Sequence, residues 1–151
     1  MSVIGLTGCF SCGKSSVLRM LKNKGAYVFD CDEFIHACYK NKESPVYRKV
    51  AKEFPDVLER GRINRRKLGR LAFSDRRKLK ALEAIVHPQA IKGLLSWVKK
   101  ARKNKVLCVG EVPLLFEKKL DRYFDKIILV AVKRSVQIKR IREKYNFSRA
   151  E

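Results

Sequence analysis

The segment Gly8-Cys9-Phe10-Ser11-Cys12-Gly13-Lys14-Ser15 has the most specific chemical signal in this sequence. It matches G-x-x-x-x-G-K-[ST], the pattern of a phosphate-binding P-loop. In such a loop the glycines let successive backbone N–H groups face an anion, and the following helix adds its positive end. Lys14 would reach the β- and γ-phosphates, and the Ser15 hydroxyl would ligate Mg²⁺. An ordinary glycine-rich turn is the weaker interpretation, because the motif falls between a predicted strand and a predicted helix.

Carboxylates follow two of the other predicted strands. Asp30 and Asp32 stand two residues apart, so that one could face the nucleotide and accept or position the proton of an attacking hydroxyl. The alternative is a turn or a helix N-cap, which explains Asp30 equally well and Asp32 less well. Glu111 comes at the end of a third strand, where a P-loop protein places a carboxylate near Mg²⁺.

The last predicted helix carries Arg140 and Lys144, four residues apart and therefore on one side. Such cations could close over phosphates and offset the charge that develops on the transferred group. A solvated basic helix face is the alternative, and the spacing alone favours it.

These residues need a sheet edge and helices to position them. Apolar runs predict strands over 2–6, 26–29, 105–110 and 126–132, and the last run suits a parallel sheet buried on both faces. Helical spacing predicts helices over 13–24, 32–40, 44–54, 64–72 and 135–145. Residues 75–103 read as a pair of helices that changes direction near His87-Pro88, because proline disfavours the α conformation of the preceding residue.

This order of elements predicts an α/β fold, a P-loop three-layer sandwich with a mostly parallel sheet and a helical insertion. Four strands are visible and a fifth is expected but absent, since open sheets usually have about 5–6 strands. We expect residues 1–151 to form a single P-loop kinase domain. Residues 31–103 would be the helical insertion, and 134–151 a basic lid region.

The chain has 151 residues and a formal net charge of +21, of which +14 falls between residues 48 and 105. Such a charge favours an anionic partner. No RNA- or DNA-binding signature is visible, so nucleic acid is the weaker candidate. No run approaches 18 uncharged apolar residues, and we expect neither a membrane-spanning helix nor a signal peptide.

Five cysteines are an odd number and favour a reducing, cytoplasmic setting with free thiols. Cys9 and Cys12 form a C-x-x-C without the second pair that a zinc site requires. A thioredoxin-like redox role is a weaker interpretation of the same spacing. A further hypothesis is that oxidation to a disulfide would stiffen the loop and block phosphate binding.

The whole sequence resembles the dephospho-CoA kinases, the enzymes of the last step of coenzyme A synthesis. The resemblance rests on ordered, nearly collinear motifs: Ile4-Gly5-Leu6-Thr7-Gly8 with the P-loop, Asp30-Cys31-Asp32 with His36, Gly61-Arg62-Ile63-Asn64-Arg65, Leu68-Gly69, Phe73, Leu82-Glu83 before His87-Pro88, Val112-Pro113-Leu114-Leu115-Phe116-Glu117, and Gln137 with Arg140.

The resemblance implies transfer of the ATP γ-phosphoryl group to the ribose 3′-hydroxyl of dephospho-CoA, giving coenzyme A. Asp32 would be the general base, and Lys14 and Arg140 the phosphate-stabilising cations. Mg²⁺ would be held by Ser15 and Glu111. The implied ATP-binding residues are Gly8, Ser11, Cys12, Gly13, Lys14, Ser15, Ser16 and Lys144, and the implied acceptor-binding residues are Asp30, Asp32, His36, Arg65 and His87, with residues 31–103 as the acceptor-binding insertion.

The sequence departs from the family pattern at several positions. Ser11 stands where the family usually has glycine, so a positive φ there would cost about 1–2 kcal/mol. Glu111 replaces the usual aspartate, and family members continue past the lid through another strand and helix, which makes this chain short at its C-terminal end. Two alternatives stay open: another P-loop kinase acting on a nucleoside or nucleotide, and a basic nucleic-acid-binding module with a vestigial loop.

Overall fold

The computed structural model describes residues 2–145, with side chains through Glu143. The chain divides into two compact units. The first contains the segment that ends at Asp30 and the segment that begins at Trp97, and the second is Cys31–Ser96. Each unit has its own hydrophobic core and is described separately.

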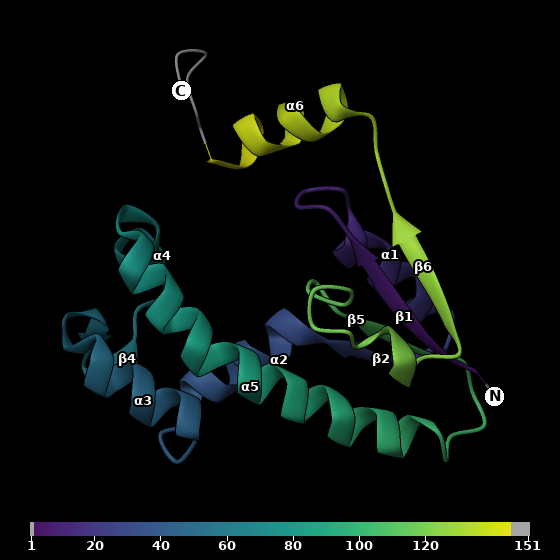
Figure 1. Ribbon diagram of the computed structural model, residues 1–151, viewed down its shortest axis with the longest axis horizontal. Coiled ribbons are helices and arrows are strands. Elements are labelled where there is room, and N and C mark those ends of the chain that lie inside the picture. The colour runs from purple at the N-terminus through teal and green to yellow at the C-terminus, as the bar shows by residue number, and fades with distance from the viewer. Residues whose placement is uncertain (1, 146–151) are drawn as a thin grey trace. The chain divides into compact units, whose positions relative to one another are not determined.

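Four parallel strands form the sheet of the first unit, in the order β2-β5-β1-β6 (Figure 1). Their bounds are Val3–Gly8 for β1, Tyr27–Asp30 for β2, Cys108–Glu111 for β5 and Lys126–Val130 for β6. The helices of this unit are α1 (Lys14–Asn23), the 3-10 turn η2 (Asp121–Tyr123) and α6 (Arg134–Tyr145). The predicted α/β class with a mostly parallel sheet is confirmed.

Strand β1 lies in the middle of this sheet, between β5 and β6, and is its most buried part. Leu6 is fully buried and packs with Leu18 of α1 and Val109 of β5. Trp97 stacks on Tyr27, with ring centroids 5.7 Å apart. The residues that pack against the core of Leu6, Leu18 and Val109 are Ile4, Val17, Leu21, Ala26, Val28, Leu107 and Val130.

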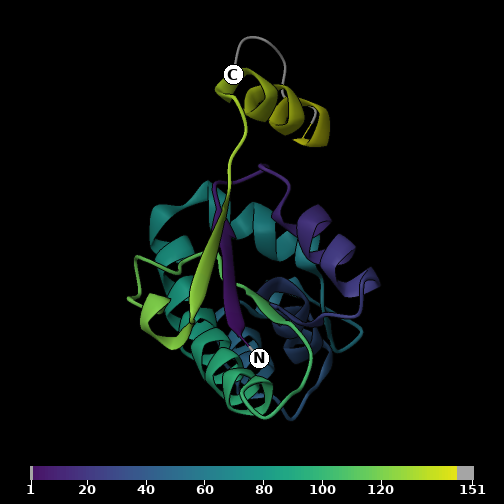
Figure 2. The ribbon, with the colours of Figure 1, turned by 90° about the vertical axis from the view of Figure 1, so that its right-hand side faces the viewer.

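Hydrogen bonds around Asp125 join the beginnings of β1 and β6, which run side by side (Figure 2). The Val3 N–H donates to Asp125 Oδ2 at 2.8 Å, and the Asp125 N–H donates to the Val3 carbonyl at 2.8 Å. These bonds, and Arg102 beside the carboxylate, hold the pKa of Asp125 below its usual value. The register that follows sets Gly8 against Val130, so the end of β1 is fixed beside β6.

The expectation that β6 would be buried on both faces is wrong. Ile128 is 37% exposed and Leu129 65% exposed. Among the described residues β6 lies at the edge of the sheet and pairs with β1. An unbroken apolar run shows that a strand tolerates burial, but the neighbouring elements determine which of its faces are covered.

The second unit consists of short helices packed around a separate apolar cluster. They are α2 (Cys31–Lys40), α3 (Pro45–Glu53), the 3-10 turn η1 (Pro55–Val57), α4 (Arg65–Ser74) and the first part of α5 (Arg76–Ala101). Polar caps fix where they begin: Ser44 Oγ accepts from the Val46 N–H at 3.1 Å, and Asn64 Oδ1 accepts from the Arg66 N–H at 3.0 Å. The buried cluster contains Val46, Val50, Phe54, Val57, Ile63 and Leu68.

A small hairpin that the sequence analysis did not predict lies between α3 and α4. Its strands, β3 (Leu58–Glu59) and β4 (Arg62–Ile63), have two residues each and are antiparallel. Arg60 at φ 50 and Gly61 at φ 71 both adopt the left-handed conformation of a two-residue hairpin turn. The Tyr47 hydroxyl donates to the Gly61 carbonyl at 2.7 Å, so a contact distant in the sequence holds the turn.

The predicted change of direction at His87-Pro88 is also wrong, because α5 is one helix of 26 residues with Pro88 inside it. An internal proline costs about 3 kcal/mol by removing a donor and crowding the preceding turn. Burying one large apolar side chain contributes about 1.5–3 kcal/mol. Since Ile85 and Val86 pack on the cluster before the proline and Leu94 is 2% exposed after it, packing outweighs the cost.

Within the described part of the chain, no helix is both long and apolar enough to cross a membrane.

We predict that Leu6→Ala lowers the free energy of unfolding by about 2–5 kcal/mol, because it leaves a cavity at the fully buried centre of the sheet. The matched control is Leu129→Ala on the exposed edge strand, which we expect to change it by less than about 0.5 kcal/mol. Urea denaturation followed by circular dichroism measures both. Equal losses would contradict the assignment of β6 as an exposed edge.

Candidate active site

The loop between β1 and α1 turns sharply through residues with positive φ. Gly8 has φ 151, Ser11 φ 57 and Gly13 φ 101. A Cβ on Gly8 would lie 2.2 Å from the carbonyl oxygen of Val130, so this position requires glycine. Ser11, which stands where the family usually has glycine, adopts the left-handed conformation, and this costs about 1–2 kcal/mol in a non-glycine residue.

Lys14, the first residue of α1, reaches back over the loop. Its Nζ donates to the carbonyl of Gly8 at 2.9 Å and to that of Cys9 at 3.0 Å. The Cys12 N–H also donates to the Cys9 carbonyl, at 3.3 Å, which closes a turn inside the loop. The ammonium group of Lys14 is therefore held directly beside the loop, where the motif predicts a phosphate.

Helix α6 contacts the same loop through two side chains. Gln137 Nε2 donates to the Phe10 carbonyl at 2.7 Å. Arg140 Nη1 donates to the carbonyl of Cys12 at 3.2 Å and to that of Ser11 at 3.5 Å. With the bonds from Lys14, all five carbonyls of residues 8–12 accept a hydrogen bond.

The structure thus brings Arg140, predicted as a phosphate-stabilising cation, to the loop. Gln137 carries the shortest bond between α6 and the loop, yet the sequence analysis assigned it no role. The i, i+3 spacing of Gln137 and Arg140, which puts both on one face of a helix, could have identified it. The side chain of Lys144 lies outside the described residues.

The first turn of α1 completes the nucleotide side of the site. Gly13 is its N-cap in a left-handed conformation and provides no side-chain cap. The first amides of a helix have no partner within the helix, so this turn can bind an anion. Ser15 and Ser16 are exposed there, as a ligand-binding turn requires.

Asp30 and Glu111 meet at the ends of neighbouring strands. They are register partners of β2 and β5, and Glu111 is also paired with Leu6 of β1. Glu111 is buried, at 4% exposure. Carboxylate and hydroxyl oxygens from Glu111 and Ser15 are the kind of ligand that Mg²⁺ takes alongside substrate phosphates, so the residues present fit this cation.

Three of the predicted acceptor-binding residues gather around Tyr39 in the second unit. The rings of His36 and Tyr39 lie 6.4 Å apart. Burial raises the pKa of the Tyr39 hydroxyl to about 12, Arg65 opposes this shift, and Asp32 adds to it. Asp32, His36 and Tyr39 follow the i, i+4, i+7 spacing of one face of α2. Tyr39 was missed in the sequence, although this spacing could have revealed it.

The fourth predicted acceptor-binding residue of this unit, His87, is half-buried on α5. Asp30 belongs to the first unit and is the last residue of β2. Only Cys31 separates it from Asp32 in the sequence.

Comparison with known proteins identifies the family. Residues 2–151 match the family model for dephospho-CoA kinase. The chain belongs to the dephospho-CoA kinase family. It is 38% identical to the dephospho-CoA kinase of Bartonella quintana over 93% of this chain and 71% of that protein. It is 40% identical to the dephospho-CoA kinase of Syntrophus aciditrophicus, over 91% of this chain and 60% of that protein.

The fold agrees with this family. A crystal structure of TT1252 from Thermus thermophilus superposes with a TM-score of 0.71 at 35% identity, covering 99% of this chain and 75% of that one. A dephospho-CoA kinase from Campylobacter jejuni shares the fold, with a TM-score of 0.67 at 22% identity. The family and the enzyme class of a kinase, both predicted from the sequence, are confirmed, and a nucleic-acid-binding module is not favoured.

We predict that Tyr39 ionises near pH 12 rather than near its ordinary pKa of 10. Because the pKa is raised in the folded state, the unfolded state loses the Tyr39 proton first as the pH rises. The contribution of the protonated Tyr39 hydroxyl to the free energy of unfolding is therefore complete below pH 10 and is lost as the pH rises toward 12. Spectrophotometric titration of wild type and Tyr39→Phe checks it. A Tyr39→Phe curve that loses amplitude near pH 10 would contradict it.

Proposed function

We propose that this chain transfers the γ-phosphoryl group of ATP to the ribose 3′-hydroxyl of dephospho-CoA, forming ADP and coenzyme A. The observation that carries this proposal is the pair of cations, Lys14 and Arg140, that hold the carbonyls of one glycine-bounded loop. Family membership supports dephospho-CoA as the acceptor, and the geometry of the loop supports a phosphate site there.

The two cations stabilise charge on the phosphates. Phosphoryl transfer passes through a loose, in-line transition state, so catalysis consists mostly of positioning and electrostatic stabilisation. Phosphate oxygens form charge-assisted hydrogen bonds, which are roughly twice as strong as those to neutral carbonyls. Lys14 and Arg140 now donate hydrogen bonds to carbonyl oxygens of the loop. When ATP binds, we expect phosphate oxygens to replace these carbonyls as the acceptors.

Ser15 and Glu111 are the residues that would hold Mg²⁺. When bound, this cation neutralises negative charge on the β- and γ-phosphate oxygens. The Glu111 side chain is one methylene longer than that of the aspartate usual in the family. Glu111 is buried and is the last residue of β5, so it lies at the carboxyl end of the strands.

Asp32 is the proposed general base, which accepts the proton of the ribose hydroxyl as it attacks. Arg65, His36, His87 and Asp30 are the proposed acceptor-binding residues. The neutral Tyr39 hydroxyl beside Asp32 and Arg65 can donate a hydrogen bond without adding negative charge near the base.

We also propose that Ser16, Gly13 and Cys12 contribute backbone or hydroxyl groups to ATP binding. We further propose that the enzyme acts in the cytoplasm, where its cysteines stay free.

The direct test is incubation of the chain with ATP and Mg²⁺, with and without dephospho-CoA, followed by mass spectrometry. We expect coenzyme A to form only when the acceptor is present. ATP consumption with a nucleoside or nucleotide acceptor, and none with dephospho-CoA, would contradict the proposed substrate. A control that omits Mg²⁺ tests the cation.

Variants of the two proposed catalytic groups should separate binding from chemistry. We predict that Asp32→Asn lowers turnover by about 10²–10⁴-fold, the usual contribution of a general base, and leaves ATP affinity nearly unchanged. Lys14→Ala should lower both ATP affinity and turnover, the latter by about 10²–10³-fold. Asp56→Asn and Lys22→Ala, exposed residues of the same types, are the matched controls. Unchanged turnover in Lys14→Ala would overturn the phosphate site.

A further inference from the structure

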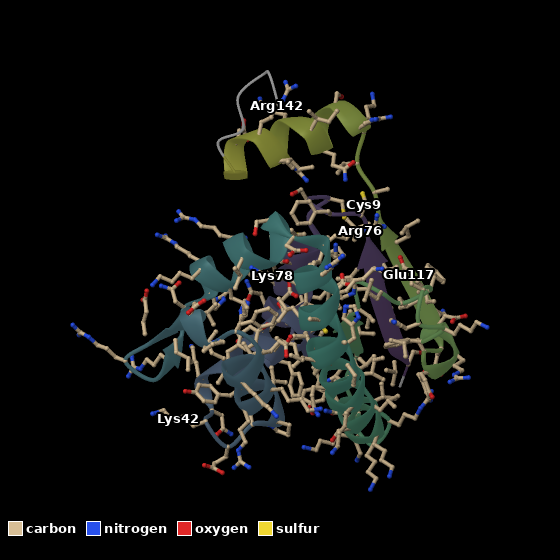
Figure 3. The ribbon with its side chains drawn as sticks, turned by 60° about the vertical axis from the view of Figure 1, so that its left-hand side comes forward. Cys9, Lys42, Arg76, Lys78, Glu117 and Arg142 are labelled. Carbon is tan, nitrogen blue, oxygen red and sulfur yellow. The ribbon has the colours of Figure 1, made fainter. Side chains whose placement is uncertain are left out.

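Two thiols of the phosphate-binding loop have no part in the proposed reaction and belong to one tight turn. Cys9 and Cys12 stand three residues apart in the sequence. Cys9 is exposed at the surface of the loop (Figure 3), whereas Cys12 is only 2% exposed. One sulfur of the pair can therefore be reached from solvent, and the other lies directly behind it.

The backbone between them has the shape that a disulfide needs. The Cys12 N–H donates to the Cys9 carbonyl at 3.3 Å, the i to i+3 bond of a tight turn. Such a turn keeps the two Cα atoms within about 7 Å, and disulfides span about 4.4–6.8 Å between Cα atoms. Among the side chains that the structure describes, no group of three or more His, Cys, Asp or Glu is placed to hold a metal.

We propose that Cys9 and Cys12 form a thiol–disulfide exchange site in the ATP-binding loop, which a low-molecular-weight disulfide oxidises and which thereby blocks nucleotide binding. The blocking step rests on the proposed function, because it assumes that this loop binds ATP. The oxidation step does not depend on it.

The reaction is a pair of exchanges that balance. The Cys9 thiolate attacks one sulfur of the small disulfide, breaks its S–S bond, releases one small thiol and forms a mixed disulfide. The Cys12 thiolate then attacks the Cys9 sulfur and releases the second small thiol. The two cysteines are oxidised, the small disulfide is reduced, and their two protons end on the released thiols. Burial raises the pKa of the Cys12 thiol, which makes exposed Cys9 the first nucleophile.

The disulfide changes the part of the loop that binds phosphate. It joins the two sulfurs at about 2.05 Å, so residues 9–12 are cross-linked and can no longer adjust around a phosphate. The Cys12 side chain is buried and its sulfur lies close to Gly8, since a Cβ placed on Gly8 would be 2.9 Å from it. The carbonyls of Cys9 and Cys12 accept hydrogen bonds from Lys14 and Arg140, so a rearrangement of the cross-linked turn also moves both cations.

The chemical step is tested by peptide mapping. Lys14 is the first basic residue of the chain, so trypsin releases residues 1–14 as one peptide that contains both cysteines. After treatment of the reduced protein with glutathione disulfide and blocking of free thiols, we expect this peptide without blocked thiols and two hydrogens lighter. A peptide with two blocked thiols, or one that keeps glutathione on Cys9 with Cys12 blocked, would overturn the proposal.

The functional step is tested as the ratio of ATP dissociation constants, oxidised over reduced, for each variant. We expect a ratio of at least about ten for wild type, reversed by a reductant, since misplacing site groups by about 1 Å costs up to roughly 10²-fold. Cys9→Ser should give a ratio near one, and Cys38→Ser, outside the loop, should keep the wild-type ratio. ATP binding that is unchanged after the disulfide has formed would overturn the inference. Absence of ATP binding in the reduced wild type would instead contradict the proposed function.

Discussion

Hydrogen bonds to the five carbonyls of residues 8–12 hold the phosphate-binding loop in the conformation on which the rest of the site depends. Lys14 supplies two of them, and Gln137 and Arg140 of α6 supply the others. A typical hydrogen bond contributes about 0.5–1.5 kcal/mol net, so the set offsets the strain of about 1–2 kcal/mol at Ser11. The same bonds fix the ammonium group of Lys14 and the guanidinium group of Arg140 beside the loop.

This loop can hold its shape because the sheet beneath it is rigid. Leu6, Leu18 and Val109 bury the centre of β1, α1 and β5, and Asp125 ties the beginning of β1 to β6. At the other end of β1, the Val130 carbonyl lies so near Gly8 that only glycine fits. Because both ends of β1 are fixed by these contacts, the loop that follows β1 and the helix α1 after it have a defined position.

Four of the five proposed acceptor-binding residues, Asp32, His36, Arg65 and His87, belong to the second unit, which has its own core. Ion pairs such as Arg48–Glu43 and Lys67–Glu59 are exposed, and exposed pairs contribute only about 0–1 kcal/mol. The excess of lysine and arginine thus adds little to stability. Such an excess of positive charge raises the local concentration of anions and attracts them over distances of about 8 Å at physiological salt.

The sequence by itself determined the phosphate-binding loop, the parallel sheet and the family, because these depend on local patterns: glycine and lysine at set spacings, and apolar runs that end in carboxylates. It also indicated Ser11 as a strained position, since the cost of a positive φ belongs to the residue. Only the tertiary structure decided what depends on distant neighbours. The exposure of β6, the continuity of α5 through Pro88, the hairpin held by Tyr47, the grouping around Tyr39 and the bond from Gln137 all result from packing between segments far apart in the chain. A local pattern states which contacts a segment can make, and the fold determines which of them are made.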